Sequence, residues 1–437
     1  MFLPESIRYC IEKLENAGFA AYAVGGCVRD DCLGLKPHDY DLCTSALPEQ
    51  TEEVFKAHRL ILAGKKHGTV AVVINGEVVE ITTFRTEGAY ADNRHPDWVE
   101  FVPDVEEDLA RRDFTVNAMA YSPTRGYADP FGGRQDLEAG ILRAVRDPKE
   151  RFSEDSLRIL RGIRFASRFR LTIEKETESA MQELAPLMEN LARERVFEEL
   201  SKMLPTLTAE ELVRFAPILA AVIPELKPLI GFDQRSPHHA YDLMTHVAHV
   251  VAQVPGDVTI RWAALLHDVG KVPTFTQDET GRGHFYGHGP ESARMADAIL
   301  RRLKSPNDLR ERVVLLIDKH MTRPLADKKF LRRQLSKLGW EAFEQLLQLQ
   351  QADMDSKGVD EPGADYKLIY ALLLEIREED SCLTLKDLAV NGRDLMALGI
   401  SGKALGETLN LLLEQVLDEV LPNEKEALLA FAAARRE

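Results

Sequence analysis

Two carboxylates two positions apart, Asp39 and Asp41 in the segment HDYDL, are well suited to bind a metal ion. If this segment is a strand, both side chains point to the same face, and their mutual repulsion calls for a cation such as Mg²⁺. Glu80, in VVEITTFR, is predicted on a neighbouring strand and would be a third acid. A surface strand can also carry two aspartates, and a hairpin can expose a glutamate, so both interpretations stay open here.

A glycine pair precedes these acids in GGCVRD, which follows a predicted strand and begins a helix. Gly25 and Gly26 let the backbone approach a ligand closely, and the helix N-terminus beside Arg29 would favour a phosphate. A plain tight turn explains the glycines equally well. If the glycine turn binds phosphate and the acids bind magnesium, the expected reaction is phosphoryl or nucleotidyl transfer. In such a reaction two metal ions stabilise the attacking and leaving oxygens.

A second group of metal-binding residue types occurs in the C-terminal half, where ALLHDVGKVP places a histidine directly before an aspartate. Histidine and aspartate suit a divalent metal, such as Mg, Mn, Ni or Co, that activates water. A lone histidine on an apolar helix is more often a core residue, but the adjacent pair is harder to explain in that way. The candidate ligands are His246, His267, Asp268 and Asp353, with His288 and His320 for a second ion.

Arginine recurs at every third position in EDSLRILRGIRF, residues 154–165. A solvated helix with Glu-to-Arg pairs is the ordinary explanation of such a run. On one continuous helix, at about 100° per residue, Asp155 and Arg158 would share a face. Arg161 would lie at the edge of that face, and Arg164 would point nearly opposite, where it could tie this helix to the preceding domain.

The elements that position these residues divide into an α/β part and a helical part. In the first third, β-rich runs alternate with helices, and Asn75-Gly76 between two β-branched runs predicts a two-residue hairpin turn. Beyond about residue 150 the pattern is nearly all helical. Stretches 225–239 and 355–367, rich in Pro, Gly and charge, are the best linker candidates.

Composition indicates a globular protein of two or three domains. The 437 residues include 45% apolar and 29% charged residues. No apolar run reaches the roughly 18 residues that cross a bilayer, and the N-terminus reads as an amphipathic helix and not as a signal sequence. We therefore expect a cytoplasmic protein with no membrane partner. The five cysteines form no CxxC pair, so neither a zinc cluster nor a disulfide framework is predicted.

The formal net charge of −16 argues, taken alone, against a nucleic-acid partner. Arginines are nevertheless dense between residues 111 and 170. Because arginine makes forked contacts to phosphates and base edges, a local basic groove is compatible with the acidic total.

Seven segments resemble, in order and spacing, the class II tRNA nucleotidyltransferases, which comprise CCA-adding enzymes and bacterial poly(A) polymerases. They span about residues 20–170 and read YAVGGCVRD, PHDYDLCTSA, KKHGTVAVV, VEITTFRTEGAYADNRHPDWVEFV, RRDFTVNAMAY, DPFGGRQDLEAGILRAV and RFSEDSLRILRGIRFA. The resemblance implies an α/β polymerase-β-like nucleotidyltransferase head followed by an all-α neck, an HD-containing body and a tail. The expected boundaries are 1–145, 146–225, 226–355 and 356–437.

The same resemblance implies the reaction and its site residues. The reaction would be addition of C, C and A from CTP and ATP to the 3′ end of tRNA, with Mg²⁺ as cofactor and no obligate protein partner. Asp39 and Asp41 would bind the magnesium ions as catalytic residues, and Glu80, expected beside them from the strand pattern above, would be the third catalytic residue. The nucleotide-binding residues would be Gly25, Gly26, Arg29, Arg111, Arg112, Asp113, Asp155, Arg158, Arg161 and Arg164.

Asp155 and Arg158 match the base-reading pair of this family, in which protein replaces a nucleic-acid template. Cytosine and adenine both present an amino donor beside a ring-nitrogen acceptor, which suits one carboxylate and one guanidinium. Uracil and guanine present the reverse order and would leave both protein groups unsatisfied. Arg161 would reach a phosphate or brace the pair.

Two further segments have family counterparts. Thr86 to Asp97 matches a flexible loop associated with the switch from C to A addition, although His95 stands where the family often has a second arginine. The region around His267 and Asp268 resembles HD-domain phosphohydrolases, or it serves only as a tRNA-binding body. The RRDF segment also fits a helix cap with a paired arginine.

The motifs leave other functions open. A poly(A) polymerase or an A-adding enzyme shares them, whereas the complete loop argues against an enzyme that adds only CC. From a different class, the chain would be an HD phosphohydrolase with a non-catalytic RNA-binding head.

Overall fold

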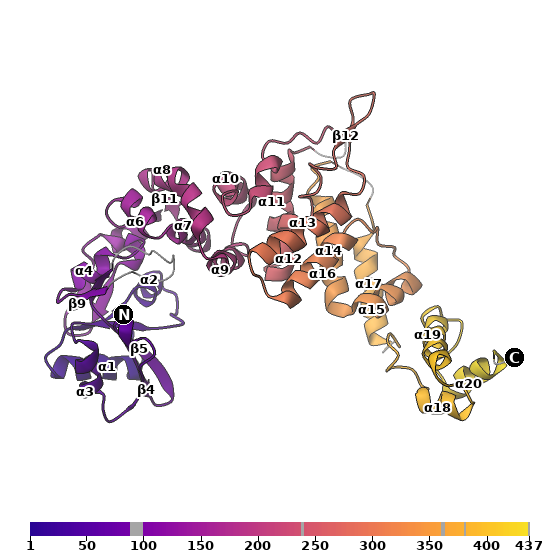
Figure 1. Cartoon of the computed structure of the whole chain (residues 1–437), viewed down its shortest axis with the longest axis horizontal. Helices are drawn as coiled ribbons and strands as arrows, with labels where there is room; N and C mark the ends of the chain where they lie inside the picture. The colour runs from indigo at the N-terminus through magenta and orange to yellow at the C-terminus, as the bar shows by residue number, and fades with distance from the viewer. Residues whose placement is uncertain (88–98, 237–239, 360–362, 380–381, 436–437) are drawn as a thin grey trace. The chain divides into compact units, whose positions relative to one another are not determined.

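The computed structural model describes residues 1–87, 99–236, 240–359, 363–379 and 382–435 (Figure 1). The chain forms two compact units. The first comprises Met1–Ile230 with Arg301–Ser305, and the second comprises Gly231–Leu300 with Pro306–Glu437. The division after Ile230 falls within the 225–239 stretch that the sequence offers as a linker.

A seven-stranded sheet forms the centre of the head. Its strand order is β3 (Arg59–Ile61), β4 (Thr69–Ile74), β5 (Glu77–Thr83), β2 (Asp41–Thr44), β1 (Ala21–Val24), β8 (Ala120–Ser122) and β9 (Gly126–Ala128). Every neighbouring pair is antiparallel except β2 and β5, which run parallel. The predicted hairpin turn is confirmed, because Asn75 and Gly76 join β4 to β5 with positive φ angles of 51° and 86°.

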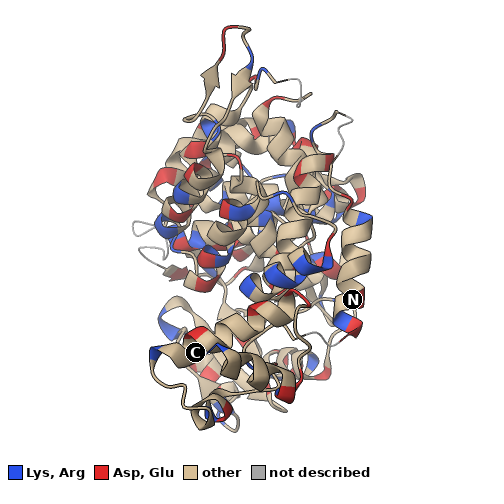
Figure 2. Ribbon diagram, turned by 90° about the vertical axis from the view of Figure 1, so that its right-hand side faces the viewer, with Lys and Arg blue, Asp and Glu red and all other residues tan. Residues whose placement is uncertain are grey.

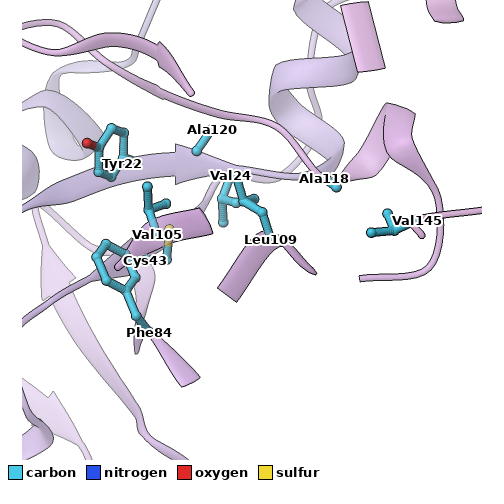
Figure 3. Close-up of a cluster of buried hydrophobic side chains, with 9 residues drawn as sticks. All are labelled: Tyr22, Val24, Cys43, Phe84, Val105, Leu109, Ala118, Ala120 and Val145. Carbon is cyan, nitrogen blue, oxygen red and sulfur yellow. The ribbon is translucent and has the colours of Figure 1, made fainter. Parts of the chain in front are cut away.

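Short helices and strands complete the head. They are α1 (Glu5–Asn16), α2 (Gly26–Cys32), α3 (Pro48–Val54), η1 (Lys65–His67), β6 (Arg85–Glu87), β7 (Val99–Phe101), α4 (Val105–Ala110), η2 (Thr115–Asn117) and α5 (Gly133–Ala139). A buried apolar cluster packs α4 against the central strands (Figure 3). It includes Val24, directly before the glycine turn, and Leu109, two positions before Arg111. The core therefore fixes the two segments that carry the predicted phosphate-binding residues.

The predicted strand HDYDLCT is shorter than expected, and Asp39 is not part of it. β2 begins at Asp41, which pairs with Val24, the last residue of β1. Because β1 ends there in the glycine turn, the residues before Asp41 have no strand to pair with on that side. The expectation that Asp39 and Asp41 lie on one strand is therefore wrong.

Helices predominate in the neck, which follows the head within the first unit. Its elements are β10 (Ile141–Leu142), α6 (Pro148–Glu154), α7 (Leu157–Phe169), β11 (Thr172–Ile173), α8 (Lys175–Leu184), η3 (Ala185–Asn190), α9 (Arg193–Met203), α10 (Ala209–Leu219) and η4 (Pro224–Leu229). The short pair β10–β11 departs from the all-α expectation.

The segment EDSLRILRGIRF is not one helix. α6 ends at Glu154, Asp155 is extended with φ −143° and ψ 99°, and α7 begins at Leu157. The reason is local, because Asp155 Oδ1 accepts the N–H of Leu157 at 3.1 Å and so competes with a helical hydrogen bond.

The second unit is also largely helical. Its elements are α11 (Leu243–Gln253), α12 (Val258–Leu266), the hairpin β12 (Thr276–Gln277) and β13 (Gly283–His284), α13 (His288–Arg302), α14 (Asn307–Lys319), α15 (Lys328–Leu338), α16 (Trp340–Asp355), α17 (Tyr366–Glu378), α18 (Gly392–Ala397), α19 (Lys403–Leu417) and α20 (Lys425–Ala434). α12 packs on α14, and α11 packs on both α12 and α16. The predicted α/β head with a largely helical remainder is confirmed. None of the helices among the described residues is both long and apolar enough to cross a membrane.

Candidate active site and metal centre

The three predicted catalytic acids line one pocket of about 1000 Å³ in the head. Asp41 begins β2, and Glu80 lies beside it on β5, because the next residues of the two strands, Leu42 and Ile81, are paired. Asp39 reaches the same pocket from the loop between α2 and β2. The structure thus brings the acids together by strand register and a loop, and not by alternation along one strand.

The electrostatics of this pocket fit a bound cation. Surrounding protein atoms desolvate the Asp41 carboxylate and raise its pKa, Arg112 opposes that rise, and Asp39 adds to it. Neither Asp39 nor Asp41 forms an ion pair with any of the described residues. Asp39 and Asp41 line the same pocket, and carboxylate oxygens are the ligands that Mg²⁺ prefers.

The glycine turn lies against Arg112. Gly25 has φ 75°, and a Cβ at this position would lie 2.9 Å from Arg112 Nη1. The backbone conformation therefore requires glycine, whereas the Arg112 guanidinium is the end of a flexible side chain that could shift away from a Cβ. Arg112 lies beside the first turn of α2, where a phosphate would meet backbone N–H groups.

Arg29, predicted to bind the triphosphate, is buried in a polar network. Its Nη1 donates to Asn117 Oδ1 at 2.6 Å, and its Nε donates to Asp30 Oδ1 at 2.9 Å. Its guanidinium lies 4.3 Å from the centre of the Phe169 ring. In this conformation Arg29 supports the turn from inside, and direct contact with a triphosphate stays a prediction.

Arg111 and Arg112 share one buried carboxylate that the sequence reasoning missed. Asp108 lies 2.8 Å from Arg111 Nη2 and 3.3 Å from Arg112 Nη2. Burial alone would raise the pKa of Asp108, but the two guanidinium groups hold it below its ordinary value. The spacing of three and four residues along a helix was a signal that could have identified this acid.

Asp113 joins the head to the neck. It is 6% exposed and accepts hydrogen bonds from Arg161 Nε at 2.8 Å and Asn117 Nδ2 at 3.0 Å. Burial would raise its pKa, but Arg161 together with the hydrogen bonds lowers it to about 2. A continuous chain of polar contacts therefore runs from Arg29 through Asn117 and Asp113 to Arg161.

Arg164 does not tie the neck to the head, contrary to the sequence-based expectation. Its Nε donates to Glu199 Oε2 at 2.6 Å, which joins α7 to α9 within the neck. Arg161 contacts the head instead. Because α7 begins at Leu157, Arg161 lies next to Asp113 and forms an ion pair with it.

The predicted base-reading residues have separate partners in this structure. Arg158 Nη1 lies 2.8 Å from Glu154 Oε2, whereas Asp155 Oδ2 lies 3.0 Å from Arg195 Nη2 on α9. The expectation that Asp155 and Arg158 share a face of one helix is wrong, because the helix is interrupted at Asp155. Glu154 could have been identified from its spacing of four to Arg158, but Arg195, 40 positions away from Asp155, had no local signal.

Acids also neutralise other arginines of the segment 111–170. Arg143 pairs with Asp136 at 3.2 Å, and Arg151 pairs with Glu154. Basic and acidic residues are accordingly interspersed along the ribbon (Figure 2). Most arginines of this segment are therefore paired with acids in this conformation, some of which lie outside the segment, such as Asp108 and Glu199.

The candidate metal ligands of the C-terminal half lie within the second unit, on five helices or at their ends. His246, His267, Asp268 and Asp353 each place one ligand atom within 4.8 Å of the others. Asp268 forms a second such group with His288 and His320. All six residues that the sequence offers as ligands are thus brought together, with Asp268 common to both groups.

The histidine rings are oriented as metal ligands usually are. Each Nδ1 faces a backbone carbonyl and must therefore donate a proton to it, which leaves Nε2 as the atom that can bind a metal. The carbonyls and distances are Ser356 at 3.2 Å for His246, Ala264 at 2.8 Å for His267, Phe285 at 2.8 Å for His288 and Ile317 at 2.6 Å for His320. Within the described residues, the buried Nε2 atoms of His267 and His320 make no hydrogen bond.

The charges around these rings also favour a cation. Burial would lower the pKa of His267, but Asp268 and Asp353 raise it to about 10, whereas burial lowers the pKa of His320 to about 4. Lys271, 4% exposed, lies 2.8 Å from Asp268 Oδ2 and donates to Gln234 Oε1 at 2.9 Å. A buried ammonium group beside the acids is a feature that the sequence-based site did not include.

Most of the predicted flexible loop, Thr86 to Asp97, lies outside the described residues, as does His95.

Three family models match the chain. The poly A polymerase head domain matches residues 21–143, the RNA- and SrmB-binding site of polymerase A matches 170–229, and tRNA nucleotidyltransferase domain 2 matches 290–432. Matched regions thus cover the head, most of the neck and much of the second unit.

Curated relatives match over nearly the whole chain. The CCA-adding enzyme of Streptococcus mutans serotype c (strain ATCC 700610 / UA159) is 36% identical over 96% of this chain and 94% of its own length. That of Latilactobacillus sakei subsp. sakei (strain 23K) is 33% identical over 97% of this chain and 96% of its own length.

Solved structures agree with these relatives. The Bacillus stearothermophilus CCA-adding enzyme in complex with CTP aligns with a TM-score of 0.73 and 28% identity, over 100% of this chain and 98% of that one. A CCA-adding enzyme in complex with ATP aligns with a TM-score of 0.63 and 25% identity, over 99% and 95% of the two chains.

Proposed function

The chain belongs to the family of CCA-adding enzymes, and on this premise we propose that it adds C, C and A from CTP and ATP to the 3′ end of tRNA. The observation that carries the proposal is the meeting of Asp39, Asp41 and Glu80 in one pocket, beside the glycine turn that lies against Arg112. A role in tRNA maturation also fits the cytoplasmic location that the sequence predicts.

The acids of the head would hold the cofactor. Asp39 and Asp41, with Glu80 beside them, offer the oxygen ligands that Mg²⁺ requires. When bound, magnesium neutralises charge on the transferring phosphate and favours ionisation of the attacking hydroxyl. The residues of this chain position the two substrates around that point.

On the nucleotide side, the glycine turn and Arg112 would receive the triphosphate. The N–H groups of the first turn of α2 point towards such a ligand, and Arg112 supplies a cation next to them. Asp113 would orient the neck relative to this site through Arg161. The nucleotide would then lie with its phosphates at the head and its base at the start of α7.

Base selection would fall to Asp155 and Arg158. A cytosine or adenine would donate its amino hydrogen to the Asp155 carboxylate and accept from Arg158 at its ring nitrogen. Because Asp155 now contacts Arg195 and Arg158 now contacts Glu154, the base would compete with these contacts or add to them. Uracil and guanine would leave an acceptor facing Asp155 and a donor facing Arg158.

An end-point assay tests the proposal. tRNAs that end at the discriminator base, at C and at CC are offered CTP, ATP or both, and the products are sized on a gel. We expect growth to CCA and no further. A long A tail would indicate a poly(A) polymerase, and growth only from the CC end would indicate an A-adding enzyme.

Asp39→Ala should abolish the addition of both nucleotides, because the variant loses a ligand needed for either step. The exposed ion pair of Lys149 and Glu183 offers a matched control, Glu183→Gln, that should keep full activity. Addition by Asp39→Ala at the wild-type rate would refute the metal assignment.

A second candidate function is supported by the histidine cluster. We propose that His246, His267, Asp268 and Asp353 hold one divalent metal and that Asp268, His288 and His320 offer ligands for another. The buried Nε2 atoms of His267 and His320 fit a metal ion, because neither makes a well-formed hydrogen bond within the described residues, and Asp268 Oδ2 lies 3.2 Å from that of His267 as a further ligand. A metal there would supply a water-derived nucleophile for phosphoester hydrolysis.

Metal binding by this cluster can be measured apart from catalysis. Isothermal titration with Mn²⁺, Ni²⁺ or Co²⁺ should show a site in the Asp39→Ala protein that His267→Ala lacks. Hydrolysis of bis(p-nitrophenyl) phosphate should follow the same pattern. If neither metal binding nor hydrolysis depends on His267, the region serves only as a tRNA-binding body.

A further inference from the structure

The pocket of the catalytic acids has walls that the expected nucleotide-binding residues do not form. They come from the N-terminal segment and α1, the end of α2 at Asp31, the loop between α2 and β2, the start of β2, and β5. Among its lining residues are three exposed apolar side chains, Phe2 at 76%, Leu35 at 49% and Val78 at 57% of their full accessibility. Apolar side chains gathered at such exposure beside a catalytic site indicate a binding surface.

Phe2 is exposed although the residues that follow it are packed into the head. The next residue, Leu3, is 4% exposed, and Ile7, on the first turn of α1, is also 4% exposed. The Arg8 N–H donates to the Pro4 carbonyl at 3.0 Å and so continues the helix back to this segment. The backbone is therefore anchored directly beside Phe2, while the ring projects at the pocket.

The strand order separates this pocket from the glycine turn. β2 lies between β1 and β5, so Asp41 has a neighbour on each side. On one side it pairs with Val24, the residue before the turn at Gly25. On the other side it lies next to Glu80 of β5. The pocket and the turn are thus on opposite flanks of the same carboxylate.

In nucleotidyl transfer, the attacking group and the leaving group would lie on different sides of Asp41. In an in-line displacement, the attacking oxygen and the leaving pyrophosphate lie on opposite sides of the phosphorus. If the triphosphate lies at the Gly25 turn, pyrophosphate leaves on the β1 flank. The 3′-hydroxyl of tRNA must then approach from the β5 flank, where Val78 and Glu80 line the pocket.

We infer that Phe2, Leu35 and Val78 receive the unpaired 3′-terminal nucleotides of tRNA and position the hydroxyl against the catalytic acids. This inference rests on the proposed function. Unpaired bases stack on aromatic rings and pack on apolar side chains without regard to sequence, which suits a primer end that changes at each addition. Lys36, which lines the same pocket, supplies a cation for the backbone phosphates.

The acids in this pocket do not exclude an RNA strand. Glu77 accepts a hydrogen bond from Ser6 Oγ at 2.6 Å, so one of its oxygens is already engaged with the N-terminal helix. Asp39, Asp41 and Glu80 would be neutralised by the metal ions that the reaction needs. Asp31, which also lines the pocket, lies 3.6 Å from the amino group of Met1. The apolar side chains and Lys36, with His38 and Tyr40 of the same lining, then remain as contacts for the incoming strand.

Steady-state kinetics of Phe2→Ala test the inference. With tRNA ending at the discriminator base, we expect KM for tRNA to rise at least about fivefold, because a base-stacking contact is lost. KM for CTP should stay near wild type, whereas kcat at saturating tRNA should fall, because the 3′-hydroxyl is positioned less well against the catalytic acids. Phe2→Trp should restore KM for tRNA, since it retains an aromatic face. A purely structural role of Phe2 would not separate the two KM values in this way.

Leu62→Ala is the matched control, because Leu62 is 42% exposed in the same head but does not line this pocket. An unchanged KM for tRNA in Phe2→Ala overturns the inference, as does a rise in KM for CTP alone. If the wild-type protein adds no nucleotide at all, the proposed function is overturned and this inference falls with it. Normal wild-type addition with an unaltered KM for tRNA in Phe2→Ala overturns this inference alone.

Discussion

At the scale of single residues, each base-reading group is held by a different neck residue. Asp155 has two contacts, the Leu157 N–H at 3.1 Å and Arg195 at 3.0 Å. Arg158 contacts Glu154 and also donates to the carbonyl of Arg111 at 3.0 Å. These contacts fix both side chains near the junction of α6 and α7 before any nucleotide binds.

Asp155→Ala should relax the choice of base. Without the carboxylate, the amino group of cytosine loses its acceptor and uracil no longer meets a repelling group. We expect incorporation of UTP relative to CTP to rise by roughly five- to a hundredfold, the usual effect of losing a specific base contact. Competition assays with both nucleotides measure this ratio directly.

Arg214→Ala provides the comparison for this variant, because it breaks a partly exposed ion pair with Glu178 elsewhere in the neck. Its ratio of UTP to CTP incorporation should equal that of the wild type. Equal ratios in Asp155→Ala and wild type would remove Asp155 from base selection.

At the scale of elements, one of the contacts between α7 and the head is made by a buried acid. Asp113 accepts from Arg161 on α7 and from Asn117 on η2, and its pKa is lowered to about 2. A carboxyl group whose pKa is depressed on folding stabilises the protein above its ordinary pKa and loses that effect as the pH falls. The window here lies between about 3.8 and about 2.

Asp113→Asn should therefore lower the free energy of unfolding by about 1–3 kcal/mol at pH 7, as expected for a hydrogen bond to a charged group. The difference from wild type should shrink as the pH falls below about 4, because the Asp113 carboxyl of the unfolded chain is then protonated while that of the folded protein, with a pKa of about 2, still carries its charge. Urea unfolding at pH 7, 4 and 3 measures this trend. A difference that is constant across this range would show that the Asp113 charge does not stabilise the contact.

Whether an element could be predicted from the sequence depends on whether a local pattern determines it. The hairpin at Asn75-Gly76 and the helix at Glu5–Asn16 follow from local patterns, and both are as expected. The break at Asp155 is not predictable in this way, because a side chain that bonds the backbone two residues on is compatible with a helical pattern in the sequence. Asp39 is wrongly predicted on a strand, because the sequence does not say where the partner strand ends.

At the scale of the whole molecule, long-range partners mark the limit of such predictions. On α9, Glu199 pairs with Arg164 and Arg195 pairs with Asp155. The partners are 35 and 40 positions apart in the sequence, and no spacing rule connects residues at such separations. Conversely, the sequence alone suggests all six candidate metal ligands, although they span more than 100 residues. The adjacent His-Asp pair draws attention to this region, and the fold then shows that the other four side chains converge on it.

The separate partners of Asp155 and Arg158 also have a kinetic consequence. If an incoming base displaces Arg195 and Glu154, these residues act as intramolecular competitors that are always present at high effective concentration. They would weaken the apparent affinity for every nucleotide by the same factor, so the discrimination between bases would still come from the direct contacts with Asp155 and Arg158. The same competitors would speed release after each addition, so the active site would return by itself to a state ready for the next nucleotide.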